Sequence, residues 1–330
     1  MRPFLVLTVL LTVVIFSTLA GPCQAQPAQR EALVLGVAES VENIPVLIAL
    51  ERGFYADEGL DITTKSWPVG RLTLEALLRN EVDVSTVADT PIVMQSLQRR
   101  DFVVIATFSH GVPYRLVADR NSGILQPADF RGHRIGSMAG TIGQFFLHSV
   151  LADVGIAPGE ITELNVPAAE SGDALMQNRV DAIAVIDPYG YYAQMALGDR
   201  AVLLPFDRSQ HEQTFNYVTR RDFSQQRPLT AQRLLRATQR AIEWGRTHHQ
   251  EAVAITARRL KMDEKVLEAL WSNYRHIITL DQALIISLEG EARWAIRNGL
   301  SGGKIVPNYL EFIDTTSLDA VMPGAVSIVR

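Results

Sequence analysis

The sequence predicts an α/β protein made of two similar lobes and a helical tail, on the basis of three observations. Apolar strand-like segments alternate with helix-like segments from about residue 33 to residue 204. Residues 76–83 recur at 174–181, with Ala, Leu, Asn, Val and Asp at matching positions. After about Pro228 the pattern is helical only. Such alternation predicts parallel sheets covered by helices on both faces, and the recurrence predicts two of them.

Composition limits the possible classes of protein. The chain has 330 residues, a formal net charge of −5 and 47% hydrophobic residues. That length exceeds the usual span of one core, and the apolar fraction excludes a disordered chain. A small excess of acidic over basic side chains, 36 against 31, argues against a nucleic-acid partner. The single cysteine excludes a disulfide framework and a cysteine metal cluster.

Residues 1–25 have the order of an export signal. Arg2 precedes an apolar run over 4–16, and a small-x-small site ends at Ala25. The run is shorter than the roughly 20 residues of a membrane-spanning helix. Cleavage after Ala25 removes 25 of 330 residues, including Cys23, and leaves a chain of 305 residues. The alternative is a lipoprotein signal with Cys23 as the lipid acceptor. A periplasmic protein, most simply a soluble one, is therefore expected.

The elements follow from the apolar pattern and from helix-start signals. Pro45 and Pro91 fall in the first turns of two predicted helices, where a missing N–H costs nothing. The predicted strands are 33–38, 61–67, 82–87, 103–109, 114–118, 134–137, 161–166, 182–186 and 201–204. The predicted helices are 43–52, 72–80, 90–98, 141–154, 171–178, one from 189, and then 229–247, 250–260, 263–272 and 281–298.

Ligands in open α/β sheets bind beyond the carboxyl ends of strands, where helix N-termini offer free N–H groups. The candidate loops are therefore 39–43, 67–71, 88–90, 109–113, 138–143 and 186–189. In the fifth loop, the glycines of 140–143 either admit a ligand to the backbone or merely turn the chain. Asp89 and Asp187 either cap the helices that follow them or meet a cationic group of the ligand. Trp67 either stacks on a ligand or packs in the protein.

Catalytic motifs are missing from the sequence. There is no His-x-x-x-His pair, no Gly-x-Ser-x-Gly elbow and no Gly-x-x-x-x-Gly-Lys-Ser/Thr loop. A mature chain without cysteine has no thiol nucleophile. These observations favour a binding protein over an enzyme, and they give no indication of a cofactor or metal.

The segment Ile44–Asp61 contains Ala-x-x-x-Gly-Phe-Tyr-x-x-Glu-Gly-Leu-Asp. It resembles the opening of the nitrate/sulfonate/taurine group of periplasmic solute-binding proteins of ABC transporters. Further resemblances follow in the family's order, although Asn80 replaces a common glycine: Ala76–Val84, Arg131–Gly136, Gly140–Gly155 and Asn178–Ala182, which leads to Asp187-Pro188. The resemblance covers about Leu33 to Thr219.

The resemblance implies a type II periplasmic binding-protein fold. Residues 31–112 and 217–330 would form the first lobe and 113–216 the second, with the helical tail packed on the first lobe. Two crossing segments would lie near 111–114 and 212–217. The expected monomer would close over a small polar or anionic solute by hinge motion and deliver it to an inner-membrane permease with its ATPase.

The ligand contacts that the loops and the resemblance together predict are Ser40, Asn43, Trp67, Asp89, Thr90, Ser109, His110, Thr141, Ile142, Asp187 and Tyr189. Family members for small oxyanions often carry a hydroxyl residue in place of Asp89 and an aromatic in place of Asp187. Two acidic residues instead favour a zwitterionic or amine-bearing solute. Two alternatives remain open. One is an enzyme on this fold, of the thiamine pyrimidine-precursor or menaquinone-pathway type. The other is an exported ligand-sensing subunit.

Overall fold

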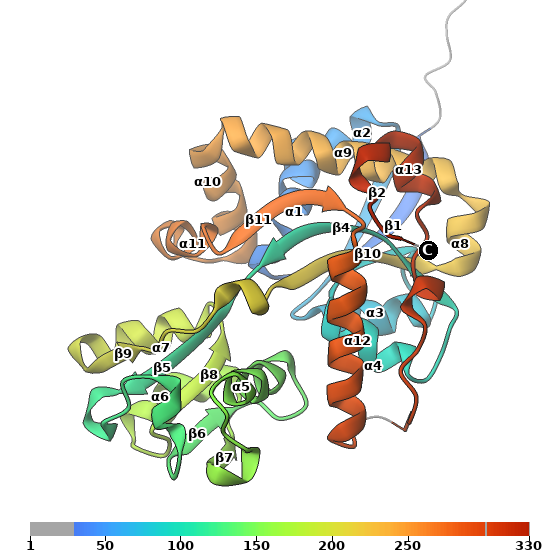
Figure 1. Cartoon of the computed structure of the whole chain (residues 1–330). Coiled ribbons are helices and arrows are strands. Elements are labelled where there is room, and N and C mark those ends of the chain that lie inside the picture. Colours follow the sequence, from blue (N-terminus) through green and yellow to red (C-terminus); the bar gives the residue numbers. More distant parts are fainter. Residues whose placement is uncertain (1–29, 301, 330) are drawn as a thin grey trace, which may run out of the picture.

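The computed structural model describes residues 30–300 and 302–329, so the predicted export segment with Cys23 lies outside the described residues. The described chain forms two lobes, each built on its own sheet (Figure 1). The larger lobe, with the C-terminal helices, lies at the upper right of the view and the smaller lobe at the lower left. Among the described residues, no helix combines the length and apolar character that crossing a bilayer requires.

The larger sheet has six strands in the order β11-β4-β10-β3-β1-β2. They are β1 (Glu31–Ala38), β2 (Leu60–Trp67), β3 (Val84–Ala88), β4 (Phe102–Gly111), β10 (Gln213–Arg220) and β11 (Tyr274–Thr279). Strand β1 is parallel to β2 and β3, whereas β10 is antiparallel to β3 and β4. The prediction of purely parallel sheets is therefore wrong, because the chain returns from the smaller lobe along β10 in the opposite direction.

The smaller sheet has five strands in the order β7-β6-β8-β5-β9. They are β5 (Tyr114–Asp119), β6 (Arg134–Ser137), β7 (Thr162–Asn165), β8 (Ala182–Ile186) and β9 (Ala201–Leu203). Alternate residues of β5 point to opposite faces, as strand geometry requires. Leu116 packs in one core with Phe146, and Val117 packs in another with Leu175. Helices therefore cover both faces of this sheet.

Of the α-helices in the described part of the chain, ten are assigned to the larger lobe by their place along the chain and three to the smaller. Those of the larger lobe are α1 (Ile44–Glu51), α2 (Phe54–Asp57), α3 (Gly70–Leu78), α4 (Asp89–Ser96), α8 (Arg221–Gln226), α9 (Pro228–Thr247), α10 (His249–Leu260), α11 (Glu264–Trp271), α12 (Gln282–Arg297) and α13 (Thr316–Val321). Those of the smaller lobe are α5 (Ile142–Asp153), α6 (Ser171–Met176) and α7 (Tyr189–Leu197).

The sequence predicted a purely helical tail, and this prediction is wrong. Strand β11 lies between α11 and α12 and pairs antiparallel with β4 at the edge of the larger sheet. The tail also returns to the first lobe, where α12 packs on α4 and α9 packs on α1. The sheet changes between Gly111 and Tyr114, and again between Leu203 and Gln213. The predicted lobe boundaries at 113 and 217 remain predictions.

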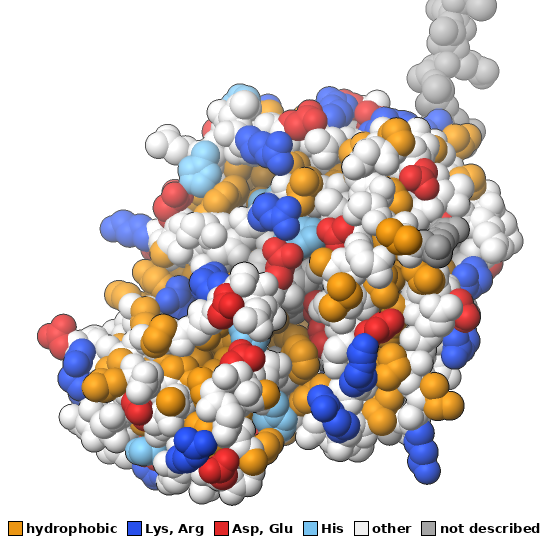
Figure 2. Space-filling view, viewed as in Figure 1, with side chains coloured by type: hydrophobic (Ala, Val, Ile, Leu, Met, Phe, Trp, Pro, Cys, Tyr) orange, Lys and Arg blue, Asp and Glu red, His pale blue; other side chains and the backbone are white. Residues whose placement is uncertain are grey.

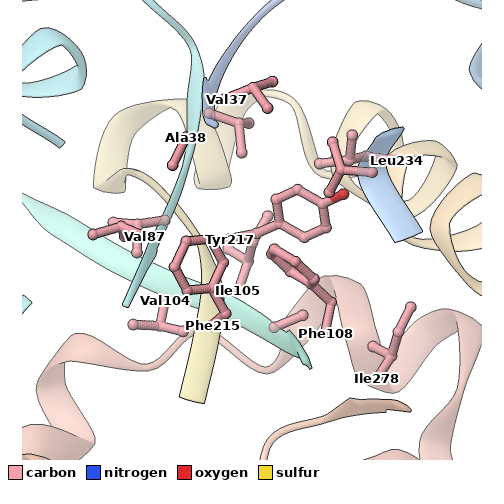
Figure 3. Close-up of a cluster of buried hydrophobic side chains, with 14 of the residues drawn as sticks. Val37, Ala38, Val87, Val104, Ile105, Phe108, Phe215, Tyr217, Leu234 and Ile278 are labelled. Carbon is pink, nitrogen blue, oxygen red and sulfur yellow. The ribbon is translucent and has the colours of Figure 1, made fainter. Parts of the chain in front are cut away.

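The core of the larger lobe lies between its sheet and the helices packed against that sheet (Figure 3). Phe108 of β4 is fully buried, and its ring lies 4.5 Å from that of Tyr217 and 5.8 Å from that of Phe215, centroid to centroid. Leu234 of α9 and Ile278 of β11 belong to the same core. The C-terminal elements are therefore part of the first lobe's core.

The recurring segment has the same geometry in both lobes. Asn80 and Asn178 each adopt a positive φ, 61° and 55°, in the turns before β3 and β8 respectively. The carboxylate of Asp83 accepts the N–H of Val34 at 2.8 Å, and that of Asp181 accepts the N–H of Arg134 at 2.8 Å. The two lobes thus repeat one helix-turn-strand unit.

Candidate functional site

A hollow separates the two lobes, and acidic and histidine side chains gather where the lobes meet (Figure 2). Contacts bridge the lobes on both sides of this junction. The side-chain amide of Asn273 donates to Asp187 Oδ2 at 3.0 Å, and the indole N–H of Trp294 donates to His148 Nδ1 at 3.1 Å. The predicted strand-end loops contribute residues to this region from both lobes.

The loop after β1 presents unpartnered polar atoms. Asn43 is fully buried and donates its Nδ2 to the carbonyl of Ala38 at 2.7 Å. Among the described residues, its Oδ1 and the buried Oγ of Ser40 have no hydrogen-bond partner. Between them lies Glu42, whose pKa is raised by burial and by the charge of Asp187.

Asp89 begins α4 and is almost fully buried. Its carboxylate accepts the backbone N–H of Thr90 at 3.0 Å and that of Thr214 at 3.1 Å. Burial nevertheless raises the pKa of Asp89 to about 6. Glu291 of α12 is its buried neighbour, and burial together with the charge of Asp89 raises the pKa of Glu291 well above its usual range. Glu291 also interacts with the hydroxyl of Thr90, and both groups are buried.

Two tyrosines mark where the acidic groups converge. Burial raises the pKa of Tyr114 well above its usual value, and the charges of Asp89, Glu291 and Glu42 raise it further. Burial has the same effect on the pKa of Tyr274, which the charges of Glu42 and Asp187 also raise. The phenol oxygen of Tyr274 is buried and interacts with the carboxyl of Glu42. Four carboxyl groups from four separate segments therefore lie close enough to affect the pKa of one or both of these tyrosines.

Asp187 is the most heavily bonded of the four. Arg115 Nε donates to Asp187 Oδ1 at 2.7 Å, and the N–H of Tyr191 donates to the same oxygen at 3.0 Å. The Tyr191 bond fits the capping alternative, since it satisfies an N–H in the first turn of α7. Burial raises the pKa of Asp187 despite the charge of Arg115. Burial and the charge of Arg115 lower the pKa of Arg208, which places two guanidinium groups near this carboxylate.

The smaller lobe contributes the start of α5. Thr141 is its N-cap, accepting the N–H of Gly143 at 3.2 Å and donating to the carbonyl of Met138 at 2.6 Å. Ile142 packs against the smaller core. Further along the same helix, His148 donates through Nε2 to Glu163 Oε2 at 2.9 Å while its Nδ1 accepts from Trp294. This bonding requires a neutral imidazole with its proton on Nε2.

The other predicted contacts lie in different surroundings. His110 is buried and bonded to Glu212, in the segment that leads into β10, at 3.1 Å and to Thr279 of β11 at 3.1 Å. Ser109 is buried, with an unpartnered Oγ among the described residues. Trp67 packs against the larger core, and Tyr189 is exposed.

Glu42, Glu291, Tyr114 and Tyr274 were not singled out from the sequence. Glu42 falls inside a predicted loop. Glu291 carries a stronger signal, because it lies on the apolar stripe of α12 that Leu284, Leu288 and Ala292 define, where a charge is out of place. Among the described residues, no group of three or more His, Cys, Asp and Glu side chains is arranged to hold a metal ion. The arrangement is suited to binding a charged polar solute.

The chain is similar to proteins that bind organic sulfur compounds. A Bacillus subtilis (strain 168) protein that carries the name of an aliphatic sulfonates-binding protein is 27% identical over 275 residues, covering 80% of this chain and 81% of that protein. The periplasmic aliphatic sulphonate binding protein SsuA from Escherichia coli has a TM-score of 0.79 at 20% identity, covering 87% of this chain and 92% of SsuA. The fold is therefore that of the periplasmic binding proteins.

The same fold also carries an enzyme. The desulfurization enzyme DSZB has a TM-score of 0.70 at 14% identity, covering 89% of this chain and 99% of DSZB. The family described as NMT1/THI5 like matches residues 40–252, which is more than half of the chain. The resemblance to sulfonate-type solute-binding proteins is confirmed, and the chain belongs to the NMT1/THI5-like family.

Proposed function

We propose that this chain is the exported solute-binding component of an ABC importer. It captures a small zwitterionic solute, of the aminosulfonate kind, between its lobes and closes over it by hinge motion. The names of its relatives support the class of protein. The ligand class rests on one observation, which is that the charges of Glu42, Asp89, Asp187 and Glu291 reach two buried tyrosines, Tyr114 and Tyr274.

The cationic end of the solute is assigned to the carboxyl groups of the larger lobe. Burial disfavours the charged form of Glu42 and Asp89, and a bound ammonium group would offset that cost. The hydroxyl oxygens of Thr90 and Tyr274 interact with Glu291 and Glu42 and can accept N–H bonds from the ligand. Asp187 is already paired with Arg115 and contributes less free charge.

The anionic end is assigned to the opposite side of the junction. Arg115 and Arg208 carry positive charge there, and the N-terminus of α5 at Thr141 adds the partial positive charge of a helix. A plain sulfonate would satisfy only this side and leave the buried carboxyls unmatched. A solute with both ends would match both.

Calorimetry with taurine and with ethanesulfonate tests this assignment, because the two differ only in the amine. We expect taurine to bind about tenfold tighter or more, the usual effect of a charge-assisted hydrogen bond. Thr141→Ala and Asp187→Ala should weaken binding without unfolding the protein. Equal affinity for the two probes would remove the cationic subsite, and unchanged affinity in both variants would remove the placement of the solute.

Binding without conversion is the second half of the proposal. Mass spectrometry of the released solute should return the compound that was added, and turnover would instead indicate an enzyme like DSZB on the same fold. Uptake of labelled solute by cells with and without this chain tests the importer role. A signalling response without uptake would favour an exported sensing subunit.

A further inference from the structure

The larger lobe contains a pocket of about 430 Å³ that lies beside the junction of the lobes. It is enclosed by α1, α9, α10, α11 and the edge strand β11. Ile48, Ile242, Arg246, Trp271, Tyr274 and His276 are among its lining residues. Its volume falls within the range of about 300–1,000 Å³ that small-molecule sites occupy. None of the predicted ligand contacts lines it.

His276 is the clearest sign that this pocket is built for a ligand. Both ring nitrogens of His276 are buried, and neither has a hydrogen-bond partner among the described residues. Burial and the nearby charge of Arg246 lower the pKa of His276 to about 3, so the imidazole is neutral at neutral pH. A neutral imidazole has one donor and one acceptor, and leaving both unmet in a buried position is costly.

The charge of the pocket is positive. Its lining includes Arg246 and Arg275 and no carboxylate. Arg275 is paired with Glu212 at 3.3 Å. Arg246 donates only to the carbonyl of His276, at 3.3 Å, and forms no ion pair with any described residue. A guanidinium has five N–H donors, so Arg246 retains capacity for a carboxylate.

The walls are flat and apolar. The rings of Tyr274 and His276 are parallel, with centroids 6.4 Å apart, and Trp271 meets His276 edge-on at 6.0 Å. Ile48 and Ile242 also line the pocket. Such surfaces favour a planar ring, which stacks or packs edge-on at these spacings.

We propose that this pocket is a second ligand site, distinct from the hollow between the lobes, and that it binds a small aromatic carboxylate. Arg246 pairs with the carboxylate, the unpartnered nitrogens of His276 bond to polar atoms of the ligand, and the ring lies against Trp271 and Tyr274. The two sites share Tyr274, but the charge pairing proposed here, with Arg246, does not depend on which solute the hollow binds.

Calorimetry with benzoate and with its neutral analogue benzamide tests the proposal on the full mature chain. Benzoate should bind saturably and about tenfold tighter than benzamide, because only benzoate pairs with Arg246. Arg246→Gln should remove this preference and Arg246→Lys should keep part of it. Arg293→Gln, on the exposed face of α12 and paired with Glu289, is the matched control and should change nothing.

Nitrogen NMR of the His276 imidazole locates the bound benzoate without relying on a variant. Its ring signals should shift as benzoate is added and much less with benzamide. Absence of saturable benzoate binding, equal affinity for benzamide, or unshifted His276 signals at benzoate saturation would each overturn the proposal. If Arg246→Gln fails to fold, the lysine variant and the imidazole signals decide the question.

Discussion

His276 makes the stability of this protein depend on pH in a way that a single substitution isolates. Its pKa is lowered from 6.5 to about 3, mainly by burial. Between these values the unfolded chain binds a proton that the folded protein excludes, so stability is complete above 6.5 and is lost as the pH falls toward about 3. From about pH 7.5 to about pH 5 the loss should be about 2 kcal/mol.

Urea denaturation of the wild type and of His276→Phe at both pH values measures this loss. Other buried carboxyls also titrate in this window, but they are common to both proteins and cancel in the difference. The wild type should therefore lose about 2 kcal/mol more than the variant on acidification. His276→Gln is the control. It also lacks the titrating group, so its free energy of unfolding should change with pH as that of His276→Phe does, with a different constant offset. Parallel pH curves for wild type and His276→Phe would refute the reasoning.

Affinity of the hollow for taurine should fall as the pH drops below about 6, because the pKa of Asp89 is raised to about 6 and protonation removes its charge; calorimetry at about pH 7.5 and about pH 5 checks this, and a constant affinity contradicts it. Trp294→Phe removes the donor to His148, so taurine affinity should fall about fivefold; an unchanged calorimetric affinity would show that this contact does not stabilise the closed form. Phe108→Ala should lower the free energy of unfolding by about 3–5 kcal/mol in urea denaturation, and a much smaller loss would contradict the tight core.

Most elements were predictable because their signals are local. The helices predicted over 229–247 and 141–154 depend on signals close to their first residues, and the structure has them as α9 (Pro228–Thr247) and α5 (Ile142–Asp153). Strand β11 was missed because its residues, 274–279, lie between two strongly helical segments. Its strand conformation comes from pairing with β4, more than 160 residues earlier in the chain. Strand direction was missed for the same reason, since antiparallel β10 is set by where the chain re-enters the lobe.

The residues of the candidate site also differ in whether their signals in the sequence are local. Asp89 and Asp187 were found because each follows a strand and precedes a helix, which is a local pattern. That Arg115 and Asn273 would hold Asp187 was not predictable, because they come from β5 and from the turn before β11. The two readings of Trp67, stacking on a ligand or packing, depended on tertiary contacts, and the structure packs it on the core.

Family membership and ligand class rest on different parts of the chain. The family match spans residues 40–252 and therefore includes Glu42, Asp89 and Asp187 but neither Tyr274 nor Glu291. Those two residues lie in the tail, where Tyr274 interacts with Glu42 and Glu291 interacts with Asp89. A relative can thus share the first-lobe loops with this chain and still bind a different solute. The ligand class therefore depends on residues of β11 and α12. Glu291, a buried glutamate on the apolar stripe of α12, is the most costly of these groups to bury and the one that most needs a cationic partner.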